Sequence, residues 1–273
     1  MKITIWGSRG SIASAGPETR RYGGNTACVE IAAEHDELLV LDAGTGMRQA
    51  GVAHAGDGRP VHVLLTHLHM DHIQGLGFFR PLFEPGREVH IWGPPSTTLA
   101  LRARLTRYLS PPLFPVRLAD LGSNVTLHDV QIDPWRIGSL TVGAATVIHP
   151  GPTVGYRIAG EGATIAYLPD HEPALGGIRG TDWTSGYDLA TSVDVLLHDA
   201  QYTAAEYSDR VGWGHSAIEH AVAFADLARV NLLALMHHEP EHSDDQLDEI
   251  LMMATTARHG GVIAAADGMI LEV

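Results

Sequence analysis

The sequence predicts a layered α/β sandwich with two central β-sheets and helices on the outside. Short apolar runs rich in Val, Ile and Leu dominate its first half, whereas strands and helices alternate in its second half. Gly, Pro, Asp and Asn bound these runs, as they commonly bound strands. The 273 residues suffice to bury one large core and no linker-like stretch divides them, so we expect a single domain over residues 1–273.

The apolar runs predict the strands of both sheets. In chain order, they are Lys2–Trp6, Ala27–Ala33, Leu38–Leu41, Val61–Thr66, Glu88–Trp92, Leu140–Val147, Thr153–Ile158, Ala163–Leu168, Val193–Leu197, Leu232–Met236, Val262–Ala265 and Met269–Val273.

Three segments have helical patterns. Pro94–Leu109 follows a proline pair and has Ser96 as a candidate N-cap. Ser216–Ala228 carries apolar residues at helical spacing. Ser243–Ala257 can be capped by its first serine, and two aspartates then suit the positive end of the helix.

Charge and cysteine content limit the class of protein. Lys and Arg total 18 against 32 Asp and Glu, a formal net charge of −14, so the chain has no global attraction for nucleic acid or an anionic membrane. Its single cysteine, Cys28, forms no internal disulfide. Without a signal-peptide pattern or a long apolar run, we expect a soluble cytoplasmic protein with no membrane contact.

The 17 histidines include a cluster directly after the apolar run that begins at Val61. On extended backbone His67 and His69 project to the same side, and a following turn brings Asp71 and His72 to a neighbouring point. Three imidazoles and a carboxylate within six residues suit Zn²⁺ first, with Fe, Mn or Co as alternatives. A polar turn with surface histidines is the competing interpretation, but the H-x-H-x-D-H spacing is far more constrained than a lone histidine pair.

This motif resembles that of the metallo-β-lactamase-fold hydrolases, and the resemblance extends over nearly the whole chain. It implies a four-layer αββα sandwich, the metallo-β-lactamase fold. The family also has a third-strand histidine, a bridging aspartate and a late histidine, which His149, Asp170 and His237 match at the ends of apolar runs. Asp42 matches an early aspartate that is expected to orient a metal ligand.

The resemblance implies two divalent metal ions, Zn²⁺ first, with Mn²⁺ or Fe as alternatives, and a hydroxide held between them. The implied ligands are His67, His69 and His149 for one ion, Asp71, His72 and His237 for the other, and Asp170 as the bridge. Three alternatives stay open: His149 is a satisfied loop histidine, His238 replaces its neighbour His237, or His171 joins the site. Adjacent side chains on extended backbone point apart, so we expect His171 either behind the metal ligands or at the rim of the site.

A second motif resembles the phosphodiesterase branch that includes ribonuclease Z. Gly214-His215-Ser216 opens a predicted helix 22 residues before His237, and the histidine of this motif is expected to protonate the leaving group. Residues 198–201 resemble the branch's His-Glu-Ala-Thr element, with Asp199 in place of Glu and Gln201 in place of Thr. The implied catalytic residues are Asp71, His215 and Asp199, the last orienting His215. An exposed histidine beside a helix cap is the alternative.

Three further segments bear on the substrate. Ribonuclease Z inserts a long basic arm between its third histidine and bridging aspartate, whereas the 21 positions from His149 to Asp170 fit only a hairpin. The glycine-rich opening from Trp6 to Thr26 is either an ordinary loop or an anion site that uses its N–H groups and arginines. Three arginines on the Pro94–Leu109 helix indicate a solvated surface, and the region is also a candidate wall or cap over the pocket. Its residues are Arg102, Arg104, Arg107, Phe78, Phe79, Phe83, Tyr108, Leu113 and Phe114.

Together these observations predict a binuclear metal-dependent hydrolase, a phosphodiesterase that acts on a small or cyclic phosphodiester through metal-bound hydroxide. The first alternative is a carbonyl-ester hydrolase, such as a lactonase, thioesterase or β-lactamase-like enzyme, at the same site. The second is a non-hydrolytic metal-binding or redox member. We expect a small-molecule substrate rather than a large nucleic acid, and a homodimer is left open.

Overall fold

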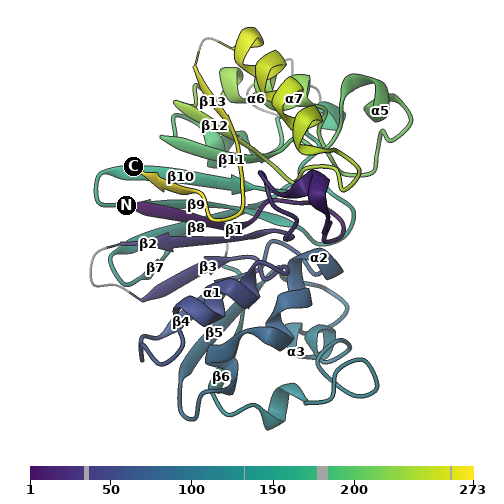
Figure 1. The fold of residues 1–273 in the computed structure, drawn as a ribbon. Coiled ribbons are helices and arrows are strands. Elements are labelled where there is room, and N and C mark those ends of the chain that lie inside the picture. The colour runs from purple at the N-terminus through teal and green to yellow at the C-terminus, as the bar shows by residue number, and fades with distance from the viewer. Residues whose placement is uncertain (34–36, 132, 177–183, 259) are drawn as a thin grey trace.

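Two seven-stranded sheets face each other in the computed structural model, which describes residues 1–33, 37–131, 133–176, 184–258 and 260–273. Figure 1 shows α6 and α7 on the outer face of one sheet, and α1 and α3 on the outer face of the other. The four-layer αββα sandwich is therefore confirmed.

The first sheet has the order β14-β1-β2-β3-β4-β5-β6. Its strands are β1 (Lys2–Gly7), β2 (Cys28–Ala32), β3 (Leu38–Leu41), β4 (Val61–Leu64), β5 (Glu88–Gly93), β6 (Asn124–Asp129) and β14 (Ile270–Glu272).

The second sheet has the order β13-β12-β11-β10-β9-β8-β7. Its strands are β7 (Trp135–Ile137), β8 (Leu140–Thr146), β9 (Val154–Gly160), β10 (Ala163–Leu168), β11 (Val195–Asp199), β12 (Leu232–Met236) and β13 (Gly261–Ala264).

Helices connect the strands and cover the outer faces of the sheets. The α-helices are α1 (Met47–Ala53), α2 (Met70–Ile73), α3 (Leu101–Leu105), α4 (Tyr187–Ala190), α5 (Ala204–Ser208), α6 (Ile218–Leu227) and α7 (Asp244–Ala257). Short 3₁₀ helices are η1 (Pro17–Thr19), η2 (Gln74–Phe78), η3 (Arg80–Phe83), η4 (Leu118–Asp120) and η5 (Pro173–Gly176). Among the described residues, no helix combines the length and apolarity needed to cross a bilayer.

Parallel pairing places the functional loops together. Strands β3 to β6 pair in parallel in the first sheet, and β10 to β13 do so in the second. The carboxyl ends of parallel strands lie at one edge of a sheet, so the segments that follow β3, β4, β10, β11 and β12 gather at a common edge. The segment from His149 to Asp170 forms the antiparallel hairpin β9–β10, as its length predicts.

Burial of apolar side chains holds the layers together. Ile5 and Leu39 of the first sheet pack with Tyr156 and Leu197 of the second in the cluster between the sheets. Two further apolar clusters lie under the outer helices. Burial of a large aliphatic or aromatic side chain contributes about 1.5–3 kcal/mol, so the clusters fix the spacing of the sheets whose ends carry the site.

The predicted helix Pro94–Leu109 is wrong in its extent, because only α3 is helical and Ala100, not Ser96, is its N-cap. The prolines and small polar residues before it favour extended backbone. Helix α7 begins as predicted, with Ser243 in a capping box. Strands β6 and β7 were not predicted; β6 alternates partly buried with exposed residues and lacks a continuous apolar run.

The apolar residues of the candidate wall divide between the core and the described surface, where Phe78, Phe83 and Leu113 are exposed. Phe79, Tyr108 and Phe114 are buried in the core under the first sheet, and the Tyr108 hydroxyl donates to the carbonyl of Gln74 at 2.6 Å. Phe78 is exposed and makes an edge contact with Phe114. These rings therefore stabilise the segments that follow β4 and β5.

Candidate metal centre

The first group of metal-ligating side chains comes from the segment after β4 and the loop after β8. One ring nitrogen each of His67, His69 and His149 lies within 4.8 Å of the other two. The Nδ1 atom of His69 is 3.2 Å from Nε2 of His149. Because the chain is extended after β4, His67 and His69 face the same side, as their spacing predicts.

The second group lies beside the first. Helix α2 buries Asp71 and His72, and His237 follows β12 directly. The Oδ2 atom of Asp71 is 3.3 Å from Nε2 of His72 and 3.2 Å from Nε2 of His237. The two imidazole Nε2 atoms are 3.4 Å apart.

Asp170 lies between the two groups. Its Oδ1 is 3.0 Å from Nε2 of His72 and 3.4 Å from Nε2 of His237. Its Oδ2 is 3.7 Å from the Nε2 atoms of both His67 and His149. Each carboxylate oxygen therefore faces a different group of ligands.

These distances fit bound divalent metal. Tetrahedral coordination at about 2.0–2.1 Å separates neighbouring ligand atoms by about 3.3 Å. The distances within the second group and from its histidines to Oδ1 of Asp170, 3.0 to 3.4 Å, agree with that value. In addition, Nε2 of His67 and Oδ1 of Asp170 are buried without a hydrogen-bond partner among the described residues. Such atoms are costly unless a ligand satisfies them, so the cluster is a divalent-metal site.

Outer hydrogen bonds orient two of the histidines. Nδ1 of His72 lies 2.8 Å from Oδ2 of Asp42, and Nδ1 of His149 lies 2.8 Å from the carbonyl oxygen of Gly214. Both partners only accept, so each Nδ1 carries the proton and each Nε2 lone pair is free for a metal.

Thr66 links a third histidine to the same carboxylate. Its hydroxyl lies 2.9 Å from Oδ2 of Asp42 and 3.0 Å from Nδ1 of His67. The hydroxyl donates to the carboxylate and therefore accepts from His67, which leaves the Nε2 atom of His67 unprotonated. Tyr167 also donates to Asp42, at 3.0 Å. Asp42 is fully buried in the left-handed region at φ 56°, a strained conformation that these contacts maintain.

Gln201 orients His237, a function that the sequence analysis did not assign. Its Oε1 is 3.1 Å from Nδ1 of His237, and its Nε2 donates to Oε2 of Glu239 at 2.8 Å. The second bond fixes the amide orientation, because a carboxylate cannot donate. The only sequence signal was that Gln201 occupies the threonine position of a resembling motif.

His215 and Asp199 form a buried pair beside Asp170. Nδ1 of His215 is 2.7 Å from Oδ2 of Asp199 and 3.9 Å from Oδ2 of Asp170. The Asp199 carboxylate also accepts backbone N–H bonds from His171, Gln201 and Ser216. Burial disfavours the imidazolium, but Asp199 outweighs it and raises the pKa of His215 to about 9.

Glu172 holds the loop before His215 and was also missed. Its buried carboxylate accepts from the Tyr207 hydroxyl and from the N–H groups of Gly212 and Gly214, at 2.7–2.8 Å. Gly214 lies at φ 92°, and a Cβ there would be 2.3 Å from Nδ1 of His149, so only glycine fits. A glutamate two residues after the predicted bridging aspartate gives no sequence signal for this long-range contact.

His238 and His171, the neighbours of His237 and Asp170 in the chain, point away from the metal-ligand cluster. His238 lies 2.9 Å from the carbonyl oxygen of Ala265, and burial lowers its pKa to about 3. His171 is buried, with its Nδ1 2.9 Å from Nε2 of His198, which excludes the rim. Its N–H donates to Asp199, so it lies in the shell around the cluster, the other place that we expected. Neither belongs to a group of potential metal ligands among the described residues.

The charge of the site favours cations. Burial disfavours the charged imidazole, but Asp170 and Asp71 outweigh it and raise the pKa of His72 well above its ordinary value. Burial also disfavours the Asp170 carboxylate, but surrounding histidines hold its pKa well below its ordinary value. At His67 burial prevails and holds the pKa well below its ordinary value. A bound cation would replace the proton on His72.

The opening segment is not an anion site at Arg9, because that side chain is fully buried. Arg9 donates to the carbonyl oxygens of Gly23, Glu239 and His242, which fastens the opening loop to the segment after His237. The loop continues to Ser11, whose N–H donates to Oδ2 of Asp71 at 2.8 Å.

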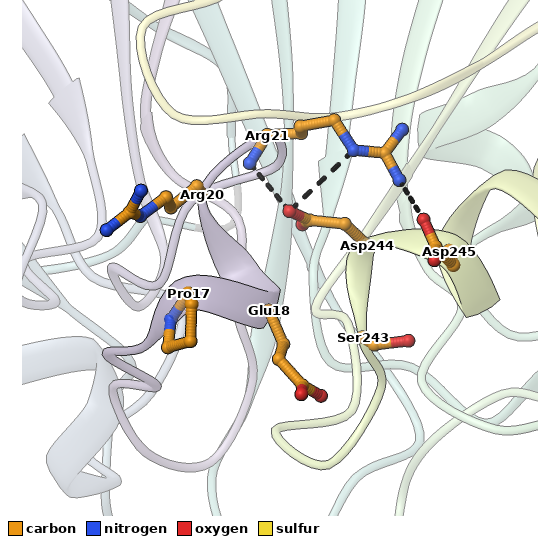
Figure 2. A pocket seen from close by; sticks show the side chains of 7 residues that line it. All are labelled: Pro17, Glu18, Arg20, Arg21, Ser243, Asp244 and Asp245. Atoms are coloured by element: carbon orange, nitrogen blue, oxygen red, sulfur yellow. Dashed lines mark hydrogen bonds and ion pairs between the residues drawn. The ribbon is translucent and has the colours of Figure 1, made fainter.

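Arg20 and Arg21 of the opening segment line a separate cavity of about 510 Å³ between η1 and the start of α7. Figure 2 shows Arg21 turned toward Asp244 and Asp245, and its guanidinium lies 2.6 Å from the carboxylate of Asp245. A further ion pair of 2.5 Å joins Arg21 to Asp248. These carboxylates satisfy Arg21, and no potential metal ligand of the cluster lines this cavity.

Known proteins share both the sequence pattern and the fold. The chain matches the Beta-lactamase superfamily domain over residues 38–238. Ribonuclease Z of Myxococcus xanthus (strain DK1622) is 27% identical over 277 residues, covering 88% of this chain and 89% of the relative.

Solved structures agree over nearly the whole length. The metallo-beta-lactamase fold protein YhfI from Bacillus subtilis superposes with a TM-score of 0.72 at 20% identity, covering 99% of each chain. A diphosphatase from the PhnP family superposes with a TM-score of 0.71 at 18% identity, covering 100% of this chain and 97% of the other. Zn²⁺-bound PqqB from Methylobacterium extorquens superposes with a TM-score of 0.67 at 21% identity, covering 100% of each chain. The chain therefore belongs to the beta-lactamase superfamily and is a metal-dependent hydrolase with the metallo-β-lactamase fold.

Proposed function

We propose that this chain is a single-domain, binuclear metal-dependent phosphodiesterase that acts on a small or cyclic phosphodiester. The observation that carries the proposal is the His215–Asp199 pair, 2.7 Å between Nδ1 and Oδ2, beside a carboxylate shared by two ligand groups. Phosphodiester cleavage expels an alkoxide that needs a proton, and a buried, oriented imidazolium can supply it.

The two ligand groups around Asp170 would hold the ions, with His67, His69 and His149 in one and Asp71, His72 and His237 in the other. Zinc suits this set of imidazoles and carboxylates best, with manganese or iron as alternatives. When bound, such cations lower the pKa of water and neutralise phosphoryl oxygens. Outer hydrogen bonds already orient His72, His149 and His237, so these ligands require little movement to accept the ions.

His215 would donate its Nε2 proton to the leaving oxygen as the phosphorus–oxygen bond breaks. Its Nδ1 proton stays on the hydrogen bond to Asp199, which holds the ring in place and stabilises its positive charge. No hydrogen bond to Nε2 of His215 is found within the described ranges, which leaves that atom available to a substrate.

Size and charge favour a small substrate. The relative named ribonuclease Z acts on RNA by its name, whereas the structural neighbour from the PhnP family is named a diphosphatase. In this chain the short hairpin β9–β10 occupies the segment where the resemblance places a basic arm, and the net charge of −14 repels polyanions.

The test measures hydrolysis of bis-(p-nitrophenyl) phosphate by metal-loaded protein, with metal content determined in parallel. We expect turnover that His215→Ala reduces about 10²–10⁴-fold, whereas His220→Ala on α6, outside the potential ligand groups, retains it. Cyclic nucleotides, lactones, thioesters and tRNA-length RNA complete the screen. Equal turnover by His215→Ala, or turnover of carbonyl esters alone, would overturn the proposal.

A further inference from the structure

A pocket of about 240 Å³ adjoins the first ligand group. His67 and His69 line it together with Ser96, Arg104 and Arg107 from the segment that follows β5. Residues 150–152, directly after His149, contribute a further part of its lining. The pocket is therefore continuous with the metal centre, although nothing in the metal chemistry requires arginines there.

Arg104 is anchored but incompletely satisfied. Its Nη2 donates to the carbonyl oxygen of Pro94 at 2.6 Å, while the exposed carboxylate of Asp129 is 3.9 Å away. Its Nε is buried with no hydrogen-bond partner among the described residues, and only 13% of the side chain is exposed. An N–H group in this state is costly unless a ligand accepts from it.

Arg107 is exposed, and no ion pair or hydrogen bond to its guanidinium is found in the described part of the chain. This contrasts with Arg21 in the cavity of Figure 2, which has carboxylate partners at 2.5 and 2.6 Å. In a chain with a net charge of −14, two arginines in one pocket whose nearest printed carboxylate is the exposed Asp129, 3.9 Å from Arg104, are a local exception.

The size and chemistry of the pocket define its ligand. Sites for drug-sized ligands span about 300–1,000 Å³, so a pocket of this volume suits a smaller group. Guanidinium groups bind phosphate through paired, charge-assisted hydrogen bonds. The hydroxyls of Ser96 and Thr98, 3.1 Å apart in the lining, add further donors.

We propose that this pocket binds a second anionic group of the substrate, a terminal phosphate carried by the same molecule as the scissile diester. Arg107 contacts this phosphate, with Arg104 anchored beside it. The preferred substrate class is therefore a small phosphodiester that also bears a phosphomonoester. This inference rests on the proposed phosphodiesterase activity and adds its specificity.

The test measures kcat/KM of metal-loaded protein for three substrates. They are a thymidine dinucleotide without a terminal phosphate, the same dinucleotide with a 5′-phosphate, and the same dinucleotide with a 3′-phosphate. We expect one phosphorylated form to be preferred at least tenfold over the unphosphorylated parent. Arg107→Ala should reduce that ratio to within about twofold, mainly through KM, and Arg107→Lys should retain part of it. The control is Arg102→Ala on α3, five residues before Arg107, which lies outside the pocket lining and should keep the full ratio.

The outcomes separate the two proposals. If the wild-type protein cleaves the unphosphorylated dinucleotide or bis-(p-nitrophenyl) phosphate without preferring a terminal phosphate, the inference is overturned and the phosphodiesterase stands. A preference that survives in both Arg107→Ala and Arg104→Ala also overturns it, because the phosphate then binds elsewhere. Absence of turnover on every phosphodiester refutes the underlying function instead.

Discussion

Oε1 of Gln201 lies 3.1 Å from Nδ1 of His237 and thereby fixes which nitrogen of that histidine carries the proton. The amide is held from its other side by Glu239 and by the Ser11 hydroxyl, at 2.8 and 3.1 Å. Since Ser11 also donates its N–H to Asp71, one set of contacts orients two potential ligands of the same cation.

Replacing Gln201 with Ala should weaken metal binding about 10–100-fold, because His237 loses the acceptor that keeps its proton on Nδ1. Competition with a chromogenic chelator measures this affinity without relying on activity. Gln49→Ala, a glutamine on α1 remote from the cluster, serves as the control and should bind metal as the wild type does. Unchanged affinity in Gln201→Ala would show that the contact does not support the ligand.

Removal of metal should lower the melting temperature, because the carboxylates of Asp71 and Asp170 and the unsatisfied Nε2 of His67 then remain buried without a cation. Ligand at a hundredfold excess over its Kd stabilises a fold by about 2.7 kcal/mol, which corresponds to about 5–10 °C for a domain of this size.

Calorimetry before and after chelation, with metal content verified, measures this shift. Asp170→Asn removes the carboxylate shared by both ligand groups and should lose most of the chelator effect. An identical melting temperature in the loaded and stripped wild-type protein would contradict convergence of these side chains on metal.

Asp199→Asn should reduce kcat about 10²–10⁴-fold and move the alkaline limb of its pH profile to lower pH. The carboxylate raises the pKa of His215, so its loss lowers that pKa, and the protonated donor disappears at a lower pH. Nearby cations act on His215 in both proteins and leave the direction of this difference unchanged.

A pH–rate profile on bis-(p-nitrophenyl) phosphate measures the displacement. Asp209→Asn, beyond the end of α5, is the control and should keep the wild-type profile. An alkaline limb that stays in place, despite a lower kcat, would mean that Asp199 supports the fold and not the proton on His215.

An ion pair away from the metal centre allows a prediction of how the stability of the fold depends on pH. Glu30 on β2 accepts from Nε1 of Trp6 and lies 2.9 Å from Nε2 of His54. The bond to Glu30 outweighs burial and raises the pKa of His54. Burial opposes ionisation of Glu30, but His54 lowers the pKa of its carboxyl.

The charged His54 imidazole contributes fully to the free energy of unfolding below about pH 6.5. This contribution is lost as the pH rises through the pKa of His54 in the folded protein. The ionised Glu30 carboxylate contributes to the free energy of unfolding above about pH 4.5. This contribution is lost as the pH falls through the pKa of Glu30 in the folded protein. Glu30→Gln should therefore lower the free energy of unfolding most between about pH 4.5 and 6.5, by about 1 kcal/mol for this largely buried pair.

Urea unfolding at several pH values measures the difference from wild type. Glu249→Gln, at an exposed position on α7, controls for the loss of one negative charge and should show no such window. A difference that does not vary with pH would exclude the ion pair as its cause.

The sequence alone was sufficient to predict the layered fold, the strands that lead to the site, and the close grouping of His67, His69, Asp71 and His72. These features depend on local spacing. Apolar runs bounded by turn residues define strands, and the carboxyl ends of parallel strands meet at one edge wherever the intervening helices lie.

Only the tertiary structure decided how neighbouring side chains differ. His237 faces the cluster while His238 turns to the carbonyl of Ala265, and the backbone at His237 adopts φ 58°. The Arg9 side chain is buried and donates to backbone carbonyl oxygens, whereas Arg107 lines a pocket. Hydrogen-bond partners that lie far apart in the chain determine these orientations, and the folded arrangement alone brings such partners together.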